Sequence, residues 1–242
     1  MAPRRSRMRN VLLLSTSTVH GGAYMEYAGP YLRQFLGSTK SILFVPYARP
    51  SGITHERYAG LFSEAMANAG FQAESIHTAA DPVAAVAAAE SLFIGGGNTF
   101  VLLEALHRLG LVDAVRRGVE AGMPYMGSSA GSNVAGMTLG TTNDMPIAQP
   151  PSFDALNLVP FNINPHFIDA DPDSKHMGET RETRINEFHC FNPQPVVALR
   201  EGAMLRVEGE RASVDGTRGG WLFRAGEERQ AIDTGDDLSF LL

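Results

Sequence analysis

The stretch Tyr125-Met126-Gly127-Ser128-Ser129-Ala130-Gly131 holds the pattern Gly-x-Ser-x-Gly and follows directly on an apolar run that starts at Met123. Residues compatible with a helix come after it. This layout is typical of a nucleophile elbow, a sharp strand-to-helix turn that exposes a serine hydroxyl above a sheet. Such a turn is too tight for a side chain two residues before or after the nucleophile, so both places require glycine. Only Ser129 has glycine at both, and it is therefore the candidate nucleophile.

The chain has 242 residues, a formal net charge of −6 and one cysteine, Cys190. This length can bury the core of a single α/β domain. The negative charge argues against a nucleic-acid partner, because a phosphate backbone favours a basic surface. No apolar stretch approaches the length of a membrane span, and a lone cysteine suits a reducing compartment. We therefore expect a cytoplasmic monomer or small homo-oligomer with no nucleic-acid or membrane partner.

Basic residues are concentrated at the start of the chain, where four arginines lie between positions 4 and 9. The apolar run that follows, Val11–Leu14, is too short for the hydrophobic core of a signal peptide. We expect residues 1–9 to form a flexible basic tail before the first strand.

Short apolar runs alternate with helical patterns in the first half of the chain. Strands are predicted at Asn10–Leu14, Ser41–Pro46, Phe71–Ile76, Ser91–Ile94 and Met123–Met126. Helices are predicted at Tyr24–Phe35, Thr54–Ala69, Asp81–Glu90, Thr99–Leu109 and Val112–Ala121. This alternation predicts an α/β fold with a mostly parallel, doubly wound sheet and helices on both faces.

The second half of the chain has a different character. Arg181–Phe191 predicts a helix, and from Val196 on, short apolar runs separated by turns predict antiparallel strands near the C-terminus, at the sheet edge. No repeat or linker divides the chain, so residues 10–242 are expected to form one domain. Parallel sheets bind ligands beyond the carboxyl ends of their strands, which is where the glycine-rich turns at Gly95 and Gly127 would lie.

A serine nucleophile needs a general base. Of the seven histidines, His166 stands out because it lies in the strand-like Asn162–Phe167, directly after Pro165, which fixes the backbone. A lone histidine is more often structural than catalytic. Three others, His55, His107 and His189, fall in predicted helices, where a surface or core-edge position explains them simply.

A third group should orient the imidazole. The candidates are Asp144, Asp154, Glu179, Glu187 and Glu201. Glu201 is favoured because it follows the strand-like Val196–Leu199 and precedes Gly202, where a strand would deliver a side chain to a site.

Acyl transfer also needs N–H donors for the oxyanion. The N–H of Ala130 is one candidate, and the Gly95–Gly97 turn offers another, because glycine lets the backbone approach a ligand closely. That turn matches neither the dinucleotide fingerprint nor the Walker sequence, and Asn98 is placed to cap the helix that follows. The chain has no Cys/His cluster and no His-Glu-x-x-His, so we expect no catalytic metal.

Five motifs resemble the peptidase E family of α-aspartyl dipeptidases. In chain order they are FIGGGNTF at Phe93–Phe100, GSSAGSN at Gly127–Asn133, TTNDMP at Thr141–Pro146, INPHF at Ile163–Phe167 and GETR at Gly178–Arg181. The resemblance extends to Phe153–Leu156 and to Trp221. It implies a serine peptidase, with no cofactor, on a fold like that of class I glutamine amidotransferases. The implied substrates are dipeptides with an N-terminal aspartate.

The resemblance also implies a triad that runs Ser, His, Glu along the chain. Ser129 would be the nucleophile, His166 the general base and Glu201 the acid. Two positions depart from the family pattern. Arg200 stands where the family has a proline before the acid, and Ser128 stands where it has a tryptophan or similar residue before the nucleophile.

Further roles follow from the same resemblance. Gly97 and Ala130 would form the oxyanion hole through their N–H groups. Arg181 would bind the aspartate carboxylate of the substrate, with Asn98 and Asp144 lining the same site. The simpler alternatives are an exposed arginine in the first turn of a helix, and for Asp144 a loop carboxylate that caps backbone N–H groups.

Three other functions are compatible with these residues. A cyanophycinase-like enzyme of the same fold would cut a polymer of β-linked aspartate and arginine. A non-catalytic amidotransferase-like binding protein would keep the elbow only as a turn. An α/β-hydrolase esterase would place its acid before His166, at a residue such as Asp144 or Asp154.

Overall fold

The computed structural model describes residues 9–173, 175 and 177–242. The basic tail predicted at residues 1–9 therefore falls outside the described residues, except for Arg9. The carbonyl of Arg9 accepts a hydrogen bond from the N–H of Gly209 at 2.7 Å, directly before the first strand.

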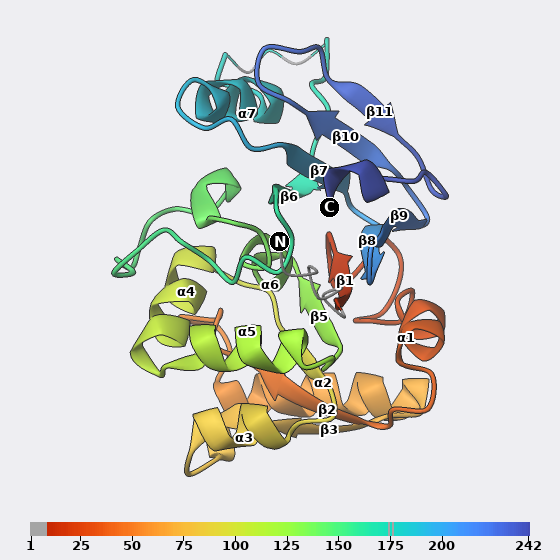
Figure 1. Cartoon of the computed structure of the whole chain (residues 1–242), viewed down its shortest axis with the longest axis vertical. Helices are drawn as coiled ribbons and strands as arrows, with labels where there is room; N and C mark the ends of the chain where they lie inside the picture. Colours follow the sequence, from red (N-terminus) through yellow and green to blue (C-terminus); the bar gives the residue numbers. More distant parts are fainter. Residues whose placement is uncertain (1–8, 174, 176) are drawn as a thin grey trace, which may run out of the picture.

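The larger sheet has seven strands among the described residues, in the order β3-β2-β4-β5-β1-β8-β9 (Figure 1). They are β1 (Asn10–Leu14), β2 (Ser41–Val45), β3 (Gln72–Ser75), β4 (Leu92–Ile94), β5 (Tyr125–Ser128), β8 (Ala203–Glu208) and β9 (Arg211–Gly216). The strands from β3 to β1 are parallel, whereas β8 and β9 are antiparallel and form one edge. The predicted α/β fold with a mostly parallel sheet is confirmed.

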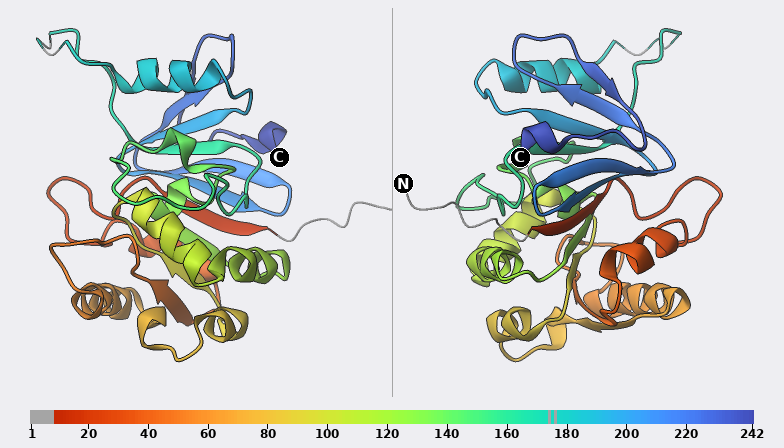
Figure 2. Two further views of the ribbon diagram at one scale, coloured as in Figure 1. Left: turned by 90° about the vertical axis from the view of Figure 1, so that its left-hand side faces the viewer. Right: turned by 45° about the vertical axis from the view of Figure 1, so that its right-hand side comes forward.

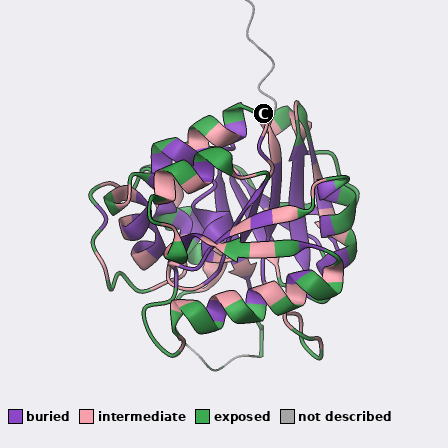
Figure 3. Cartoon of the chain, turned by 90° about the horizontal axis from the view of Figure 1, so that it is seen from below, coloured by how far each residue is buried: buried purple, intermediate pink, exposed green. Residues whose placement is uncertain are grey.

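Helices cover both faces of this sheet. They are α1 (Gly29–Leu36), α2 (His55–Ala69), α3 (Pro82–Ala88), α4 (Thr99–Arg108) and α5 (Leu111–Glu120). Val11 and Leu13 of β1 pack in a core with α3, α4 and α5, whereas Leu12 and Leu14 pack in a core with α1 and α2. After Asn10, every residue of this strand is apolar and buried, because both of its faces are covered. Figure 2 shows the helices on both sides of the sheet. The central strands are buried, while the helices are exposed on their outer sides (Figure 3).

A second, four-stranded sheet was not predicted. Its order is β11-β10-β7-β6, with bounds β6 (Asn162–Phe167), β7 (Val196–Arg200), β10 (Gly220–Phe223) and β11 (Gln230–Ile232). Val197 and Leu199 of β7 join the larger core, whereas Val196 and Ala198 pack with Ile185 of α7 (Arg181–His189). An apolar run of this length fits either sheet, so the sequence pattern could not assign it.

The first helix begins at Gly29, and the prediction of a start at Tyr24 was wrong. Met25 has a φ of 60°, and its N–H donates to the carbonyl of Ser17 at 2.7 Å. A left-handed residue cannot lie inside a right-handed helix. Pro30 then stands in the first turn, where its missing N–H costs nothing. In the described part of the chain, no helix is both long and apolar enough to cross a membrane.

Candidate active site

Ser129 lies in the sharp turn between β5 and α6 (Ala130–Asn133), with a φ of 53°. A β-carbon on Gly127 would lie 2.5 Å from the carbonyl oxygen of Gly131. One on Gly131 would lie 2.1 Å from the carbonyl oxygen of Ile94. Backbone segments approach so closely here that only glycine fits at either place.

The three serines of the elbow differ in exposure. Ser128 and Ser132 are fully buried, whereas Ser129 is partly exposed. The hydroxyl of Ser132 lies 2.6 Å from the carbonyl oxygen of Leu14 and 2.8 Å from that of Gly127, so it serves the fold. Of the three serines, Ser129 is the one that a substrate can reach.

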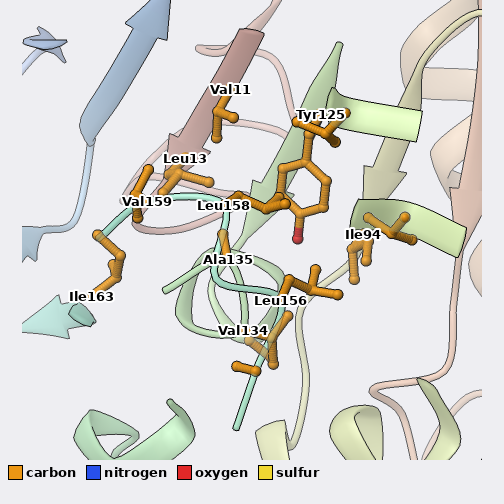
Figure 4. Packing of buried hydrophobic residues seen from close by; sticks show 14 of the residues in the cluster. Val11, Leu13, Ile94, Tyr125, Val134, Ala135, Leu156, Leu158, Val159 and Ile163 are labelled. Atoms are coloured by element: carbon orange, nitrogen blue, oxygen red, sulfur yellow. The ribbon is translucent and has the colours of Figure 1, made fainter. Parts of the chain in front are cut away.

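An apolar core supports the elbow from beneath. Figure 4 shows Tyr125 among apolar side chains from β1, β4 and the end of α6. The Tyr125 hydroxyl donates to the carbonyl of Gly131 at 2.6 Å, and burial raises the pKa of this phenol. Tyr125 therefore stays neutral and ties α6 to β5.

The glycine-rich turn after β4 packs against the nucleophile. A β-carbon on Gly96 would lie 3.0 Å from the β-carbon of Ser129. Gly97 has a φ of 149°, and a β-carbon there would lie 2.1 Å from the carbonyl oxygen of Ala48. Within the described ranges, the N–H groups of Gly97 and Ala130 donate to no other residue. Both are therefore available to a ligand beside Ser129.

His166 and Glu201 lie together, with 2.9 Å between Nδ1 of the imidazole and Oε1 of the carboxylate. His166 has a φ of 54°, and the pairing of β6 with β7 shifts register around Pro165. Such a bulge redirects a side chain, and proline is tolerated there because it donates no ladder hydrogen bond. The side chains of His166 and Glu201 are 35% and 56% exposed. No hydrogen bond between described residues joins His166 to Ser129.

Asn98 and Asp144 both stabilise the start of α4. Asn98 accepts the N–H of Val101 at 3.1 Å and donates to the carbonyl of Met145 at 2.9 Å, so the predicted cap is confirmed. Oδ2 of Asp144 accepts both the N–H and the hydroxyl of Thr99 at 2.7 Å. The carboxylate also suits the positive end of the helix dipole. The structure thus favours the capping alternative for Asp144, and contact of either residue with a substrate stays a prediction.

Arg181 is the first residue of α7 and is partly buried. Burial, and secondarily the charge of Arg184, lower the pKa of its guanidinium, whereas Asp144 raises it. Arg184 pairs with Glu179 at 3.7 Å, but Arg181 forms no ion pair with a described residue. A cation also opposes the helix dipole at this position. Arg181 is therefore a partly desolvated charge without an ion-pair partner among the described residues, which makes it well suited to bind a carboxylate.

Sequence reasoning missed a cluster around Asp169. This carboxylate accepts hydrogen bonds from Nε and Nη2 of Arg200, at 2.6 and 3.0 Å, and from Nε1 of Trp221 at 2.7 Å. The Arg200 hydrogen bond lowers the pKa of Asp169, and Asp169 raises that of Arg200. The partners are 31 and 52 residues distant in sequence, so no local signal could have found them. Arg200 thus ties the chain after β6 to the second sheet.

The acids considered from the sequence are now separated in space. Glu201 contacts His166, Asp144 caps α4, and Glu179 pairs with Arg184. The acid that contacts the histidine therefore lies after it in the chain. Among the described residues, no group of three or more His, Cys, Asp or Glu side chains could hold a metal ion.

An accessible elbow serine beside free backbone N–H groups, at the carboxyl edge of a parallel sheet, is the arrangement typical of serine hydrolases. The profile of peptidase family S51 matches residues 11–214. The chain is 49% identical to peptidase E of Streptomyces coelicolor over 96% of its own length and 95% of that protein. It is 47% identical to a Drosophila melanogaster protein named "Probable alpha-aspartyl dipeptidase", over 97% and 98% of the two chains. The chain belongs to peptidase family S51, and the predicted resemblance is confirmed.

A solved structure supports the same fold. It is that of a peptidase from an acI-B1 Actinobacterium, with a TM-score of 0.70 at 16% identity. The similarity covers 96% of this chain and 97% of that one.

Proposed function

We propose that the protein is a serine-type dipeptidase that hydrolyses dipeptides with an N-terminal aspartate. The observation that carries this proposal is the near-full-length identity of 47% to a relative named for α-aspartyl dipeptidase activity. The partly buried charge of Arg181, which forms no ion pair with a described residue, supports it, because a substrate carboxylate would otherwise be costly to desolvate.

In the proposed mechanism, Oγ of Ser129 attacks the aspartyl carbonyl carbon while Nε2 of His166 takes the hydroxyl proton. Glu201 accepts the Nδ1–H of the imidazole at 2.9 Å, which assigns the tautomer with Nε2 free to act as base. The N–H groups of Gly97 and Ala130 stabilise the oxyanion.

The protonated His166 then gives its proton to the departing amine, and the aspartyl group remains on Ser129 as an ester. Water, deprotonated by the same imidazole, hydrolyses this ester and restores the serine hydroxyl. Ser129 and His166 must approach each other for proton transfer, and such contacts commonly tighten only with substrate bound.

In this proposal, Arg181 recognises the aspartate side chain of the substrate. Its planar guanidinium can bind both oxygens of the aspartate carboxylate. A substrate with an N-terminal asparagine offers only one oxygen and no negative charge for this contact. We extend the proposal to a cytoplasmic enzyme with residues 10–242 as one peptidase domain, acting on small peptides as a monomer or small homo-oligomer. The net charge of −6 supports the absence of a nucleic-acid partner.

The test is a panel of dipeptides that differ only at the first residue. We expect turnover of Asp-Leu, and Asn-Leu slower by roughly two powers of ten, the value of a lost charge-assisted pair. A β-linked aspartate–arginine polymer should remain uncut. Equal turnover of Asp-Leu and Asn-Leu would contradict the specificity, and cleavage of the polymer would favour the cyanophycinase-like alternative. Failure of a serine-directed phosphonate to label Ser129 would favour the non-catalytic one.

A further inference from the structure

Ser15, the residue directly after β1, contacts the segments that carry both His166 and Glu201. It is fully buried. Its N–H donates to the carbonyl of Ala203 at 3.0 Å, and its hydroxyl donates to the carbonyl of Leu199 at 2.8 Å. These two carbonyls stand on either side of the turn that holds Glu201. The same hydroxyl oxygen accepts the N–H of His166 at 2.9 Å.

The preceding residue, Leu14, holds the nucleophile in the same way. Its carbonyl accepts the N–H of Ser129 at 3.1 Å and the hydroxyl of Ser132 at 2.6 Å. Two consecutive residues at the carboxyl end of β1 therefore contact all three segments of the proposed triad, which come from two different sheets.

We propose that Ser15 is a positioning residue for catalysis, which fixes the backbone of His166 relative to the turn of Glu201. The inference rests on the proposed function, because the position of His166 affects catalysis only if His166 and Glu201 act as general base and acid for Ser129. Serine is suited to the place because a hydroxyl can donate one hydrogen bond and accept another at the same time. Alanine would do neither.

The conformation of His166 explains why such a contact is needed. A φ of 54° is sparsely populated outside glycine and persists only where the surroundings hold it. The carbonyl of Pro165 accepts a hydrogen bond from Asn143 at 2.8 Å, and Ser15 holds the N–H on the other side of the same peptide. Without the hydroxyl, that peptide can rotate, and the imidazole then loses its contact with Glu201.

The test compares Ser15→Ala with a matched control, Ser91→Ala. Ser91 is also fully buried and also donates to a backbone carbonyl, that of Ser41 at 2.8 Å, but it precedes β4, at the end of the sheet away from the site. For Ser15→Ala we expect kcat for Asp-Leu to fall about tenfold to a hundredfold, because small misplacements cost this much. KM should stay within about threefold, since Arg181 is untouched. The labelling of Ser129 by an uncharged phosphonate should slow by a similar factor to kcat, whereas Ser91→Ala should match the wild type in both measurements.

A second variant covers the case in which Ser15→Ala does not fold. Ser15→Cys keeps the shape of the side chain but is a weaker donor and acceptor, so its kcat should fall between those of alanine and serine. Wild-type kcat and labelling in a folded Ser15→Ala or Ser15→Cys would overturn the positioning role alone. A wild-type protein that is neither labelled nor active would overturn the proposed function, and this inference with it.

Discussion

Two regions of the molecule contribute to the candidate site in different ways. The first region is the parallel sheet, and the second region is the four-stranded sheet with α7. The parallel sheet places Gly97 and Ser129 in the turns that follow two neighbouring strands, β4 and β5. The second region places His166 in a bulge, Glu201 in a turn between the sheets and Arg181 at the start of a helix. The first placement follows from regular topology, and the second depends on irregular backbone held by contacts distant in sequence.

The difference suggests a division of labour. In the proposed mechanism, the parallel sheet supplies the nucleophile and the backbone N–H groups, for which the local requirement is glycine at a few positions. In the same proposal, side chains of the second region supply the acid–base chemistry and the substrate selection. Changes in the first region should therefore affect all substrates alike, whereas changes in the second should separate catalysis from specificity.

The largest expected effect is that of Ser129→Ala, which should lower kcat by about 10⁶ because it removes the attacking oxygen. The fold should persist, because the hydroxyl is partly exposed and serves no core contact. Ser128→Ala is the matched control, since that hydroxyl is buried without a partner among the described residues. The control should keep wild-type activity in a dipeptide assay. Activity of Ser129→Ala within tenfold of the wild type would exclude the serine mechanism.

Glu201→Gln should lower kcat by roughly 10²–10⁴, because the amide no longer fixes the imidazole tautomer or stabilises its charged form. The carboxylate is more than half exposed, so solvent screening favours the lower end of this range. Asp154→Asn is the control, because an acid before His166 would define an α/β-hydrolase triad. If Asp154→Asn silences the enzyme and Glu201→Gln does not, the proposed order Ser, His, Glu is wrong.

The sequence predicted the first region far better than the second. Parallel strands are short and apolar, helices alternate with them, and glycine marks each close approach, so the elbow and the Gly95–Gly97 turn follow from local pattern. The site at the carboxyl edge follows from the topology. Without the family resemblance, the sequence did not decide which of several acids completes the triad. Glu201 was favoured only by its place after a strand.

The rest could not be predicted because it depends on long-range contacts. Nothing local indicates that His166 adopts a positive φ, although Pro165 before it is a weak signal of a bulge. The role of Ser15 is invisible in sequence, since its partner His166 lies 151 residues away. The apolar run Val196–Leu199 is compatible with a strand in either sheet, so the sequence pattern did not predict the second sheet.

A smaller effect is expected from Arg181→Ala, which should lower kcat/KM for Asp-X by roughly 2–4 kcal/mol, tens-fold to nearly a thousandfold. Lysine should restore only part of this, because a point charge cannot form the bidentate contact. Arg184→Ala is the control on the same helix, since it removes a cation already paired with Glu179. Phosphonate labelling of Ser129 should barely change in any of these variants. An unaltered preference for Asp-X over Asn-X in Arg181→Ala would refute the proposed role.

The smallest expected effect is that of Asp169→Asn on stability. This variant tests whether the contacts of Asp169 stabilise the second sheet and α7. Its pKa is lowered mainly by the Arg200 hydrogen bond, so its contribution to stability is present above the unfolded pKa near 3.8 and is lost as pH falls through the lower folded value. Asp169→Asn should lower the free energy of unfolding in urea by at most about 1 kcal/mol at pH 7, because the side chain is 44% exposed and solvent screens its charge. The difference from the wild type should shrink as the pH falls from the unfolded pKa towards the lower folded pKa, and it should be absent below the folded pKa. Asp113→Asn, which breaks one exposed contact with Arg116 at 3.3 Å, should cost only a few tenths of a kcal/mol. If both variants cost the same at pH 7, the three contacts of Asp169 add nothing beyond an ordinary surface pair, and the second region is held by its apolar core instead.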